Sequence, residues 1–326
     1  MTTFKEIRGT AVQSVSSDPT NPEVGQIWYN NTIGVLKGYK SIGAVWSSGS
    51  ALLTAKARYT QGGAGIQTAA LAIGGWISSS TTQTEEYNGS GWTAGGTLGA
   101  ARYGMYTGGT QTAAFAASGN GPGISTSTEE YDGSTWTGGG TVSTGRFLGG
   151  SCGIQTAGLM FGGASPPSTA ATEEYDGTSW TNGGNLNTAR NTPFSSGTQT
   201  AALASGGGPG IGNTAASEHY DGSAWTTVNS MNTARRSGAP SISGSQTSSL
   251  AFGGFTTVQV TDTESYNGTN WSNSPASLGT ARYGLGGAGT ANAALAFGGQ
   301  NNVSTQFTNT EEYTDPSFAV QTITTS

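Results

Sequence analysis

The chain has little charge and almost none of the residues that build metal or redox sites. It contains one cysteine, Cys152, and one histidine, His219, which excludes an internal disulfide and any site made of several Cys or His ligands. The 12 basic residues form no run longer than Arg235-Arg236, which argues against binding to nucleic-acid phosphates. No apolar stretch approaches the roughly 20 residues that span a bilayer. The first ten residues lack the apolar core of a secretion signal. We therefore expect no metal, no cofactor, no nucleic-acid partner and no membrane partner.

The composition is also far from that of an average globular protein. Only 9% of residues are charged and 33% are hydrophobic, while glycine alone accounts for 55 of 326. Such a composition leaves a low-complexity, unfolded chain as an alternative. The aromatic residues nevertheless recur in phase, which favours a folded, all-β protein with a distributed aromatic core.

One motif returns six times at a spacing of 44 to 47 residues. Each copy contains an Arg, a run of small residues, a Glu-x-Tyr and a Trp, and repeats of this length indicate blades, solenoid turns or an array. The arginines are Arg58, Arg102, Arg146, Arg190, Arg235 and Arg282; the glutamates are Glu85, Glu129, Glu173, Glu218, Glu264 and Glu311. The tyrosines are Tyr87, Tyr131, Tyr175, Tyr220, Tyr266 and Tyr313; the tryptophans are Trp46, Trp92, Trp136, Trp180, Trp225 and Trp271.

Each unit is predicted to form four short antiparallel strands. In the second unit, Arg102 opens the first strand and Asp132-Gly133 makes a hairpin turn of type I′ before Trp136. Units of this size are typical of propeller blades. Trp46 precedes the first Arg and no Trp follows Tyr313, so we predict that residues 44–47 supply the outermost strand of the last blade. Residues 318–324 are a competing candidate for that strand.

The units resemble kelch repeats, which carry a double glycine, a Tyr and a Trp. The double glycine stands at Gly74-Gly75, Gly162-Gly163, Gly253-Gly254 and Gly298-Gly299. Two units depart from it, with Ala117-Ser118 and Ser205-Gly206. The resemblance covers residues 44–315 and implies a six-bladed propeller with blades starting near 58, 102, 146, 190, 235 and 282, preceded by an extension over 1–43 and followed by a tail over 316–326. It implies no single activity.

The recurring glutamates are unsuited to catalysis, because a catalytic site needs unlike carboxylates and breaks the symmetry of the repeat. We expect each to pair with an Arg of its own or the adjacent blade, and we predict no catalytic residue and no enzyme. The next carboxylates, Glu86, Glu130, Glu174 and Glu312, fall on the opposite strand face. His219 and Ser265 replace them in two units, so that face is predicted to tolerate change.

The loops between the second and third strands differ in every unit and lie on one face, over residues 76–83, 120–127, 164–171, 207–216, 255–262 and 300–309. Loops on a rigid scaffold carry binding, so we expect this face to be the recognition surface. Trp76, Phe255 and Phe307 stand in these loops outside the aromatic repeat and are the candidate ligand contacts.

Residues 1–43 precede the repeat, and residues 26–39 are predicted to form a hairpin turning near 31–34. The segment Gly25-Gln-Ile-Trp-Tyr-Asn resembles leading segments of bacteriophage tail-fibre and other virion proteins. The resemblance implies a location on the surface of a phage particle, with residues 1–43 attached to other virion proteins. Two functions stay open: a tail-fibre or receptor-binding component that recognises a host surface glycan or protein, and a head decoration or other lattice-stabilising protein. An enzyme acting on polysaccharide is a third alternative, and homo-oligomerisation is left open.

Overall fold

The chain forms two units in a computed structural model that describes residues 12–22, 26–57, 63–210, 212–315 and 317–323. One unit comprises Met1–Ala44 and Asp315–Ser326, and the other comprises Val45–Thr314. The described residues form seven four-stranded sheets and contain no helix, which confirms the predicted all-β class. They therefore hold no helix long and apolar enough to cross a membrane.

The smaller unit is a single sheet in the order β1-β2-β3-β28. Its strands are β1 (Gln13–Val15), β2 (Ile27–Asn30), β3 (Val35–Ile42) and β28 (Ser317–Thr322). Strands β2 and β3 form the predicted hairpin, with Asn30 opposite Val35. Strand β28 pairs with β3, so the C-terminal residues complete this sheet instead of forming a separate tail or the last blade's outer strand.

The Asp18 carboxylate is the polar centre of the smaller unit. It accepts hydrogen bonds from Trp28 Nε1 at 3.1 Å and Asn30 Nδ2 at 2.9 Å. Lys37 Nζ lies 2.6 Å from its other oxygen. The hydrogen bond from Lys37, followed by those from Asn30 and Trp28, lowers the pKa of Asp18 to about 2.

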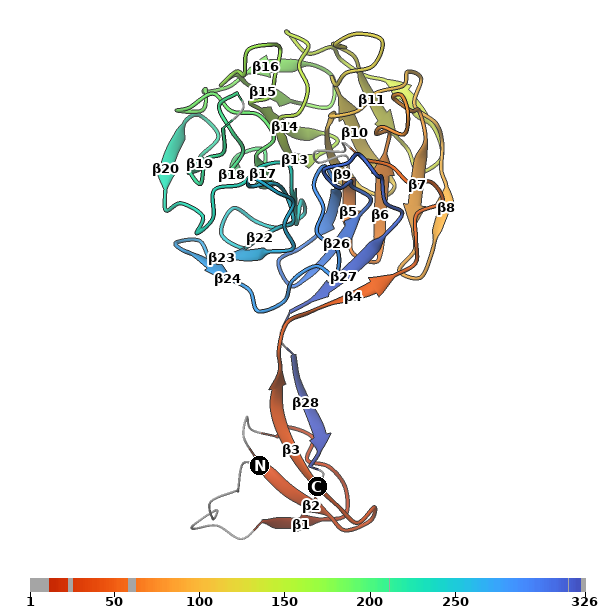
Figure 1. Cartoon of the computed structure of the whole chain (residues 1–326), viewed down its shortest axis with the longest axis vertical. Coiled ribbons are helices and arrows are strands. Elements are labelled where there is room, and N and C mark those ends of the chain that lie inside the picture. Colours follow the sequence, from red (N-terminus) through yellow and green to blue (C-terminus); the bar gives the residue numbers. More distant parts are fainter. Residues whose placement is uncertain (1–11, 23–25, 58–62, 211, 316, 324–326) are drawn as a thin grey trace. The chain divides into compact units, whose positions relative to one another are not determined.

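The larger unit contains the other six sheets, arranged like the blades of a propeller (Figure 1). The first strands of the sheets are β5 (Gly63–Ile66), β9 (Tyr106–Thr110), β13 (Gly150–Ile154), β17 (Phe194–Thr198), β21 (Ala239–Pro240) and β25 (Gly286–Gly289). The second strands are β6 (Ala69–Ile73), β10 (Ala113–Ala117), β14 (Ala157–Phe161), β18 (Ala201–Ser205), β22 (Ser249–Phe252) and β26 (Ala293–Phe297).

The two outer strands of each sheet carry the Tyr and the Trp of the repeat. The third strands are β7 (Thr84–Tyr87), β11 (Thr128–Tyr131), β15 (Thr172–Tyr175), β19 (Ser217–Tyr220), β23 (Thr263–Tyr266) and β27 (Thr310–Thr314). The fourth are β8 (Trp92–Ala94), β12 (Trp136–Gly138), β16 (Trp180–Asn182), β20 (Trp225–Val228), β24 (Trp271–Asn273) and β4 (Val45–Gly49).

Strand β4, the first strand of the larger unit in the sequence, pairs with β27, which is the last. Trp46 stands opposite Tyr313, as Trp136 stands opposite Tyr131 within one unit. The pairing predicted for residues 44–47 is therefore present.

The core lies between neighbouring sheets. One hydrophobic cluster joins Tyr106 and Phe115 to Met160, Tyr175 and Trp180 of the next sheet. Small inner residues allow this close packing: a Cβ at Gly158 would approach the Phe115 ring of the neighbouring sheet to 2.9 Å. Aromatic area between sheets thus replaces a central aliphatic core.

Two local predictions were wrong. Strand β9 begins at Tyr106, so Arg102 lies in the segment before it instead of opening it. The Asp-Gly turn is not of type I′, because Gly133 alone has a positive φ, of 91°. Four residues connect Tyr131 to Trp136, and the Asp132 carboxylate accepts the N–H groups of the turn, including that of Thr135 at 2.7 Å.

Candidate functional site

The basic residue of each unit is buried and pairs with the repeated glutamate. The pairs are Arg102–Glu129, Arg146–Glu173 (2.9 Å), Arg190–Glu218, Arg235–Glu264 (3.4 Å) and Arg282–Glu311 (2.9 Å). In the first unit Glu85 pairs instead with Lys56, whose Nζ lies 2.7 Å from its carboxylate. Arg58, which the spacing assigns to this position, lies outside the described residues.

Four of the arginines, Arg102, Arg190, Arg235 and Arg282, also bond backbone carbonyls near the ends of the variable loops. Arg282 Nη1 donates to Gly298 O at 3.0 Å and to Asn309 O at 2.8 Å, on either side of the loop between β26 and β27. Its other terminal nitrogen bonds Glu311 on β27. Burial lowers the pKa of Arg282 to about 10 while the charge of Glu311 opposes the shift, so the guanidinium is charged at neutral pH. The ion pair is thus part of the scaffold that positions the loop.

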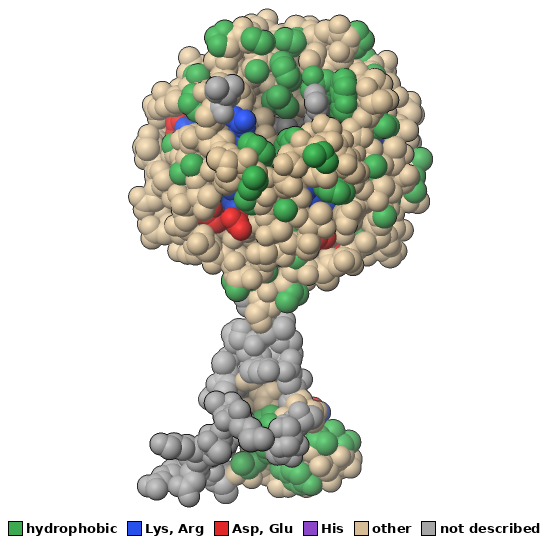
Figure 2. Space-filling model, in the orientation of Figure 1, with side chains coloured by type: hydrophobic (Ala, Val, Ile, Leu, Met, Phe, Trp, Pro, Cys, Tyr) green, Lys and Arg blue, Asp and Glu red, His purple; other side chains and the backbone are tan. Residues whose placement is uncertain are grey.

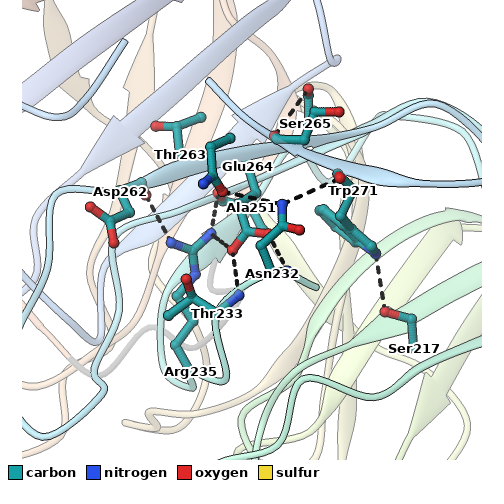
Figure 3. A network of polar contacts seen from close by, with 12 residues as sticks. Ser217, Asn232, Thr233, Arg235, Ala251, Asp262, Thr263, Glu264, Ser265 and Trp271 are labelled. Atoms are coloured by element: carbon teal, nitrogen blue, oxygen red, sulfur yellow. Dashed lines mark hydrogen bonds and ion pairs between the residues drawn. The ribbon is translucent and has the colours of Figure 1, made fainter. Parts of the chain in front are cut away.

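Figure 3 shows the fifth of these networks, which varies the pattern. Arg235 donates to Asp262 O at 3.2 Å and to Ala251 O at 2.9 Å. Glu264 also accepts the backbone N–H of Asn232 at 2.7 Å. One buried carboxylate therefore joins the segment before the first strand to the third strand of the same sheet.

A second set of carboxylates links neighbouring sheets, a role that the sequence analysis missed. Each accepts a hydrogen bond from the Tyr hydroxyl of the following unit, while His219 and Ser265 stand at the corresponding positions of the other two units. The bonded pairs are Tyr87–Glu312, Tyr131–Glu86, Tyr175–Glu130 (2.6 Å) and Tyr220–Glu174 (2.5 Å). The signal available was the Glu-Glu-Tyr motif itself, in which both carboxylates recur.

The repeated Trp also bonds across the junction between sheets. Each indole N–H donates to a Thr or Ser hydroxyl of the preceding unit. The pairs are Trp46–Thr263 (3.0 Å), Trp92–Thr310 (2.9 Å), Trp136–Thr84 (3.0 Å), Trp180–Thr128 (2.8 Å), Trp225–Thr172 (3.0 Å) and Trp271–Ser217 (3.1 Å).

A pocket of about 230 Å³ opens on the side of the variable loops. The segments that precede five of the first strands converge on it. Its lining residues are Tyr103, Phe147, Leu148, Thr192, Ser237, Tyr283, Gly284 and Gln300. The face of the larger unit seen in Figure 2 carries few charged side chains and several separate groups of hydrophobic ones.

The pocket wall contains a chain of backbone hydrogen bonds that passes from unit to unit. Leu148 N–H donates to Gly104 O at 2.8 Å, and Thr192 N–H donates to Leu148 O at 2.6 Å. Ser237 N–H continues to Thr192 O at 3.2 Å, and Gly284 N–H to Ser237 O at 2.6 Å. Leu148, Thr192 and Ser237 have positive φ values of 59°, 49° and 56°. Strained backbone of this kind, at roughly 1–3 kcal/mol per residue, concentrates at ligand sites.

Two of the three aromatic candidates border this pocket through its lining residues. Trp76 packs edge-on against Tyr103 with ring centroids 5.2 Å apart, and Phe255 packs against Tyr283 at 5.4 Å. Both form the same isolated bridge after the second strand, so they occupy equivalent positions in the repeat. Phe307 lies further along its loop, and none of the three candidates is itself a lining residue of this pocket. The lining residues Tyr103, Phe147 and Tyr283 were not among the sequence candidates.

A metal site and a reactive cysteine both have little support in the described ranges. They contain no group of three or more His, Cys, Asp or Glu side chains able to hold a metal ion. Cys152 is buried, and that burial raises the pKa of its thiol far above the ordinary value, which makes it a poor nucleophile.

The fold and the pocket define a propeller-like β protein with a small, mostly uncharged site at the end where its variable loops lie. No protein-family model matches the chain, and no curated protein matches it either.

Proposed function

We propose that the larger unit is a closed six-bladed propeller and that the chain is a non-enzymatic recognition protein of a bacteriophage particle. The first and last units are joined by the same bonds as the internal ones. Trp92 donates to Thr310, and Gln67 Nε2 donates to Ala294 O at 3.0 Å and to Tyr313 O at 2.7 Å. Strands β25 and β5 also lie against each other, as β5 and β9 do.

The recognition role rests on one observation: each unit combines scaffold contacts that repeat with a loop that differs from unit to unit. The contacts between sheets and the buried ion pairs repeat, while the loops differ, and one of the loops contributes Gln300 to a pocket with aromatic walls. A rigid scaffold with variable loops is the usual arrangement of a binding surface. The partner proposed is a host surface glycan or protein.

The bonds of the repeated carboxylates favour binding over catalysis. Glu129, Glu173 and Glu311 are tied to buried arginines, and Glu86 and Glu130 accept Tyr hydroxyls. None of the described residues that line the pocket is acidic or basic. These residues therefore do not form the pair of unlike, substrate-facing carboxylates that polysaccharide hydrolysis needs.

The proposed location on a virion rests on the resemblance of the segment that begins at Gly25. That segment includes β2 and leads into the small sheet, a folded element of its own. We propose that this sheet attaches the chain to other virion proteins.

The test is competition for adsorption. Purified full-length chain, added to host cells before the phage, should reduce adsorption, and a variant with loops 76–83 and 255–262 replaced by Gly-Ser segments should not. The matched control replaces residues 290–292, the turn between β25 and β26, which no described side-chain bond ties to a neighbouring unit. Equal competition by all three proteins, or none by the intact chain, would contradict the recognition role. Antibody labelling spread over the phage head would favour the head-decoration alternative.

A further inference from the structure

We propose that the pocket between Tyr103, Phe147 and Tyr283 binds a single neutral sugar ring. This inference rests on the proposed recognition function and specifies its ligand. Three properties of the pocket carry it: its size, its aromatic walls and its uncharged polar groups.

The size of the pocket limits its occupant to one small ring. Its volume of about 230 Å³ is below the roughly 300–1,000 Å³ of pockets that hold drug-sized ligands. It is bounded by side chains from several units and by the strained backbone at Leu148, Thr192 and Ser237, so its shape is set by the scaffold. A terminal or side-branch sugar of a longer glycan fits such a site, whereas a protein surface does not enter it.

The aromatic walls match the apolar face of a sugar. The Tyr103 and Phe147 rings are nearly perpendicular, at 80°, with centroids 6.1 Å apart. One face of a pyranose presents C–H hydrogens, which are attracted to the negative face of an aromatic ring. Trp76 packs edge-on against Tyr103, and Phe255 packs in the same way against Tyr283. The rings are thus fixed before a ligand arrives, which reduces the entropy lost on binding.

The polar groups of the pocket match hydroxyls. Tyr283 Oη accepts a hydrogen bond from Gln300 Nε2 at 2.8 Å, which leaves its own hydrogen free to donate. Within the described ranges, no protein group bonds the Ser237 hydroxyl, which is available as donor and acceptor. Neutral donors and acceptors of this kind suit sugar hydroxyls, and no described lining residue offers a charge to a carboxylate, sulfate or phosphate.

The opposite end of the first strands provides a control site. A cavity of about 290 Å³ lies there, lined by Ile66, Ile154 and Ile242 with Thr, Ser and Gly residues and no aromatic ring. The turn at 241–244 reaches across it, since Ser243 donates to Gly65 O at 2.7 Å and Gly197 N–H donates to Gly244 O at 3.0 Å. This cavity has similar size and also offers hydroxyls, but it lacks the aromatic walls that would stack on a sugar ring.

The experiment is ligand-observed NMR on the full-length chain. The probes are the methyl glycosides of glucose, galactose, mannose and N-acetylglucosamine, with glucuronic acid as the charged comparison. We expect saturation transfer to at least one neutral glycoside, with a dissociation constant of the order of 1 mM for a single ring. Phe147→Ala and Tyr283→Phe should each weaken binding about tenfold. Ile154→Ala, at the control site, should leave it unchanged.

Several results would overturn the inference. One is tighter binding of glucuronic acid than of every neutral glycoside. Another is unchanged affinity in both pocket variants; Tyr283→Phe removes one hydroxyl only and keeps this test valid should Phe147→Ala unfold. If none of the neutral probes binds while the chain still blocks phage adsorption, the sugar site is wrong and the recognition function stands. If the chain neither binds a probe nor blocks adsorption, both are wrong.

Discussion

Lys56 shows how much one side chain's geometry matters at a repeated position. In the last unit the planar guanidinium of Arg282 reaches two loop carbonyls and one carboxylate at once. Lys56 has a single nitrogen, which contacts Glu85 and makes no further hydrogen bond to a described group. Burial lowers the pKa of Lys56 while the charge of Glu85 opposes the shift. The loop ends of the first unit therefore receive fewer side-chain hydrogen bonds than those of the last unit.

The variant Lys56→Arg is expected to raise the free energy of unfolding by about 1 kcal/mol, because the guanidinium adds charge-assisted hydrogen bonds to carbonyls at the ends of the first loop. Urea unfolding at neutral pH measures the change. Arg282→Lys is the matched reverse substitution and should lower the same quantity by a similar or larger amount. A Lys56→Arg protein no more stable than the parent would show that the first unit has adapted to the shorter side chain.

The repeat, the strand order and the ion-pair partners could be predicted, because spacing and strand alternation are local properties of the sequence. The contribution of Lys56 could not be, since a fixed spacing of 44 residues places Arg58 at that position. Nor could the bonds from Tyr131 to Glu86 or the pocket formed by Tyr103 and Tyr283. They join residues from different units, and a single unit read alone contains only one partner of each contact.

At the scale of elements, the junctions between sheets are unequal. Four have a Tyr bonded to a carboxylate, whereas at the junction of β19 and β23 the partner of Tyr266 is His219. The rings meet edge-on, with centroids 5.6 Å apart, and the Tyr266 hydroxyl donates within its own turn to Gly268 O at 3.1 Å. His219 Nε2 is buried without a hydrogen-bond partner.

His219→Glu should therefore strengthen this junction. The new carboxylate can accept the Tyr266 hydroxyl, as Glu174 accepts that of Tyr220, and an unpartnered buried nitrogen is removed. We expect a gain of about 1 kcal/mol in the free energy of unfolding. The gain should disappear in the double variant with Tyr266→Phe. A gain that persists there would mean that removal of the imidazole, and not the new bond, is responsible.

The same tyrosines predict a loss of stability at alkaline pH. Burial, followed by the bonds to Glu86 and Glu130, raises the pKa of Tyr131 and Tyr175 to about 12 from the ordinary value of 10. The unfolded chain loses these protons first. Their contribution is complete below pH 10 and is lost as the pH rises through 12.

Urea unfolding midpoints measured from pH 8 to about 12 should fall above pH 10 and be flat below it. Tyr175→Phe should make the fall shallower, since one linked proton is removed. A midpoint that stays constant up to pH 12, or a variant as steep as the parent, would contradict this linkage.

At the scale of the whole molecule, β4 differs from every other fourth strand because no turn connects it to its partner. Strands β11 and β12 are joined by four residues, whereas β4 is the first strand of the larger unit in the sequence and β27 is the last. Instead of a turn, the chain next to β4 is tethered through β3, whose Ile42 pairs with Ser317 of β28 three residues after the end of β27. Side chains add to the hold on β4. Trp46 packs on Phe252 and Tyr313 with centroids at 4.8 and 5.2 Å.

Trp46→Ala should accordingly release β4 from the sheet before the molecule unfolds. Hydrogen exchange is the measurement: the amides of β4 and β27 should lose most of their protection under native conditions. Trp136→Ala is the matched control, because Trp136 is also half-buried and donates the same 3.0 Å bond to a Thr hydroxyl. There the turn keeps β11 and β12 paired, so their amides should stay protected. Equal loss of protection in the two variants would show that covalent connection does not govern these strands. Retained protection in both would mean that the backbone ladder between β4 and β27 holds the two ends of the larger unit together without the indole.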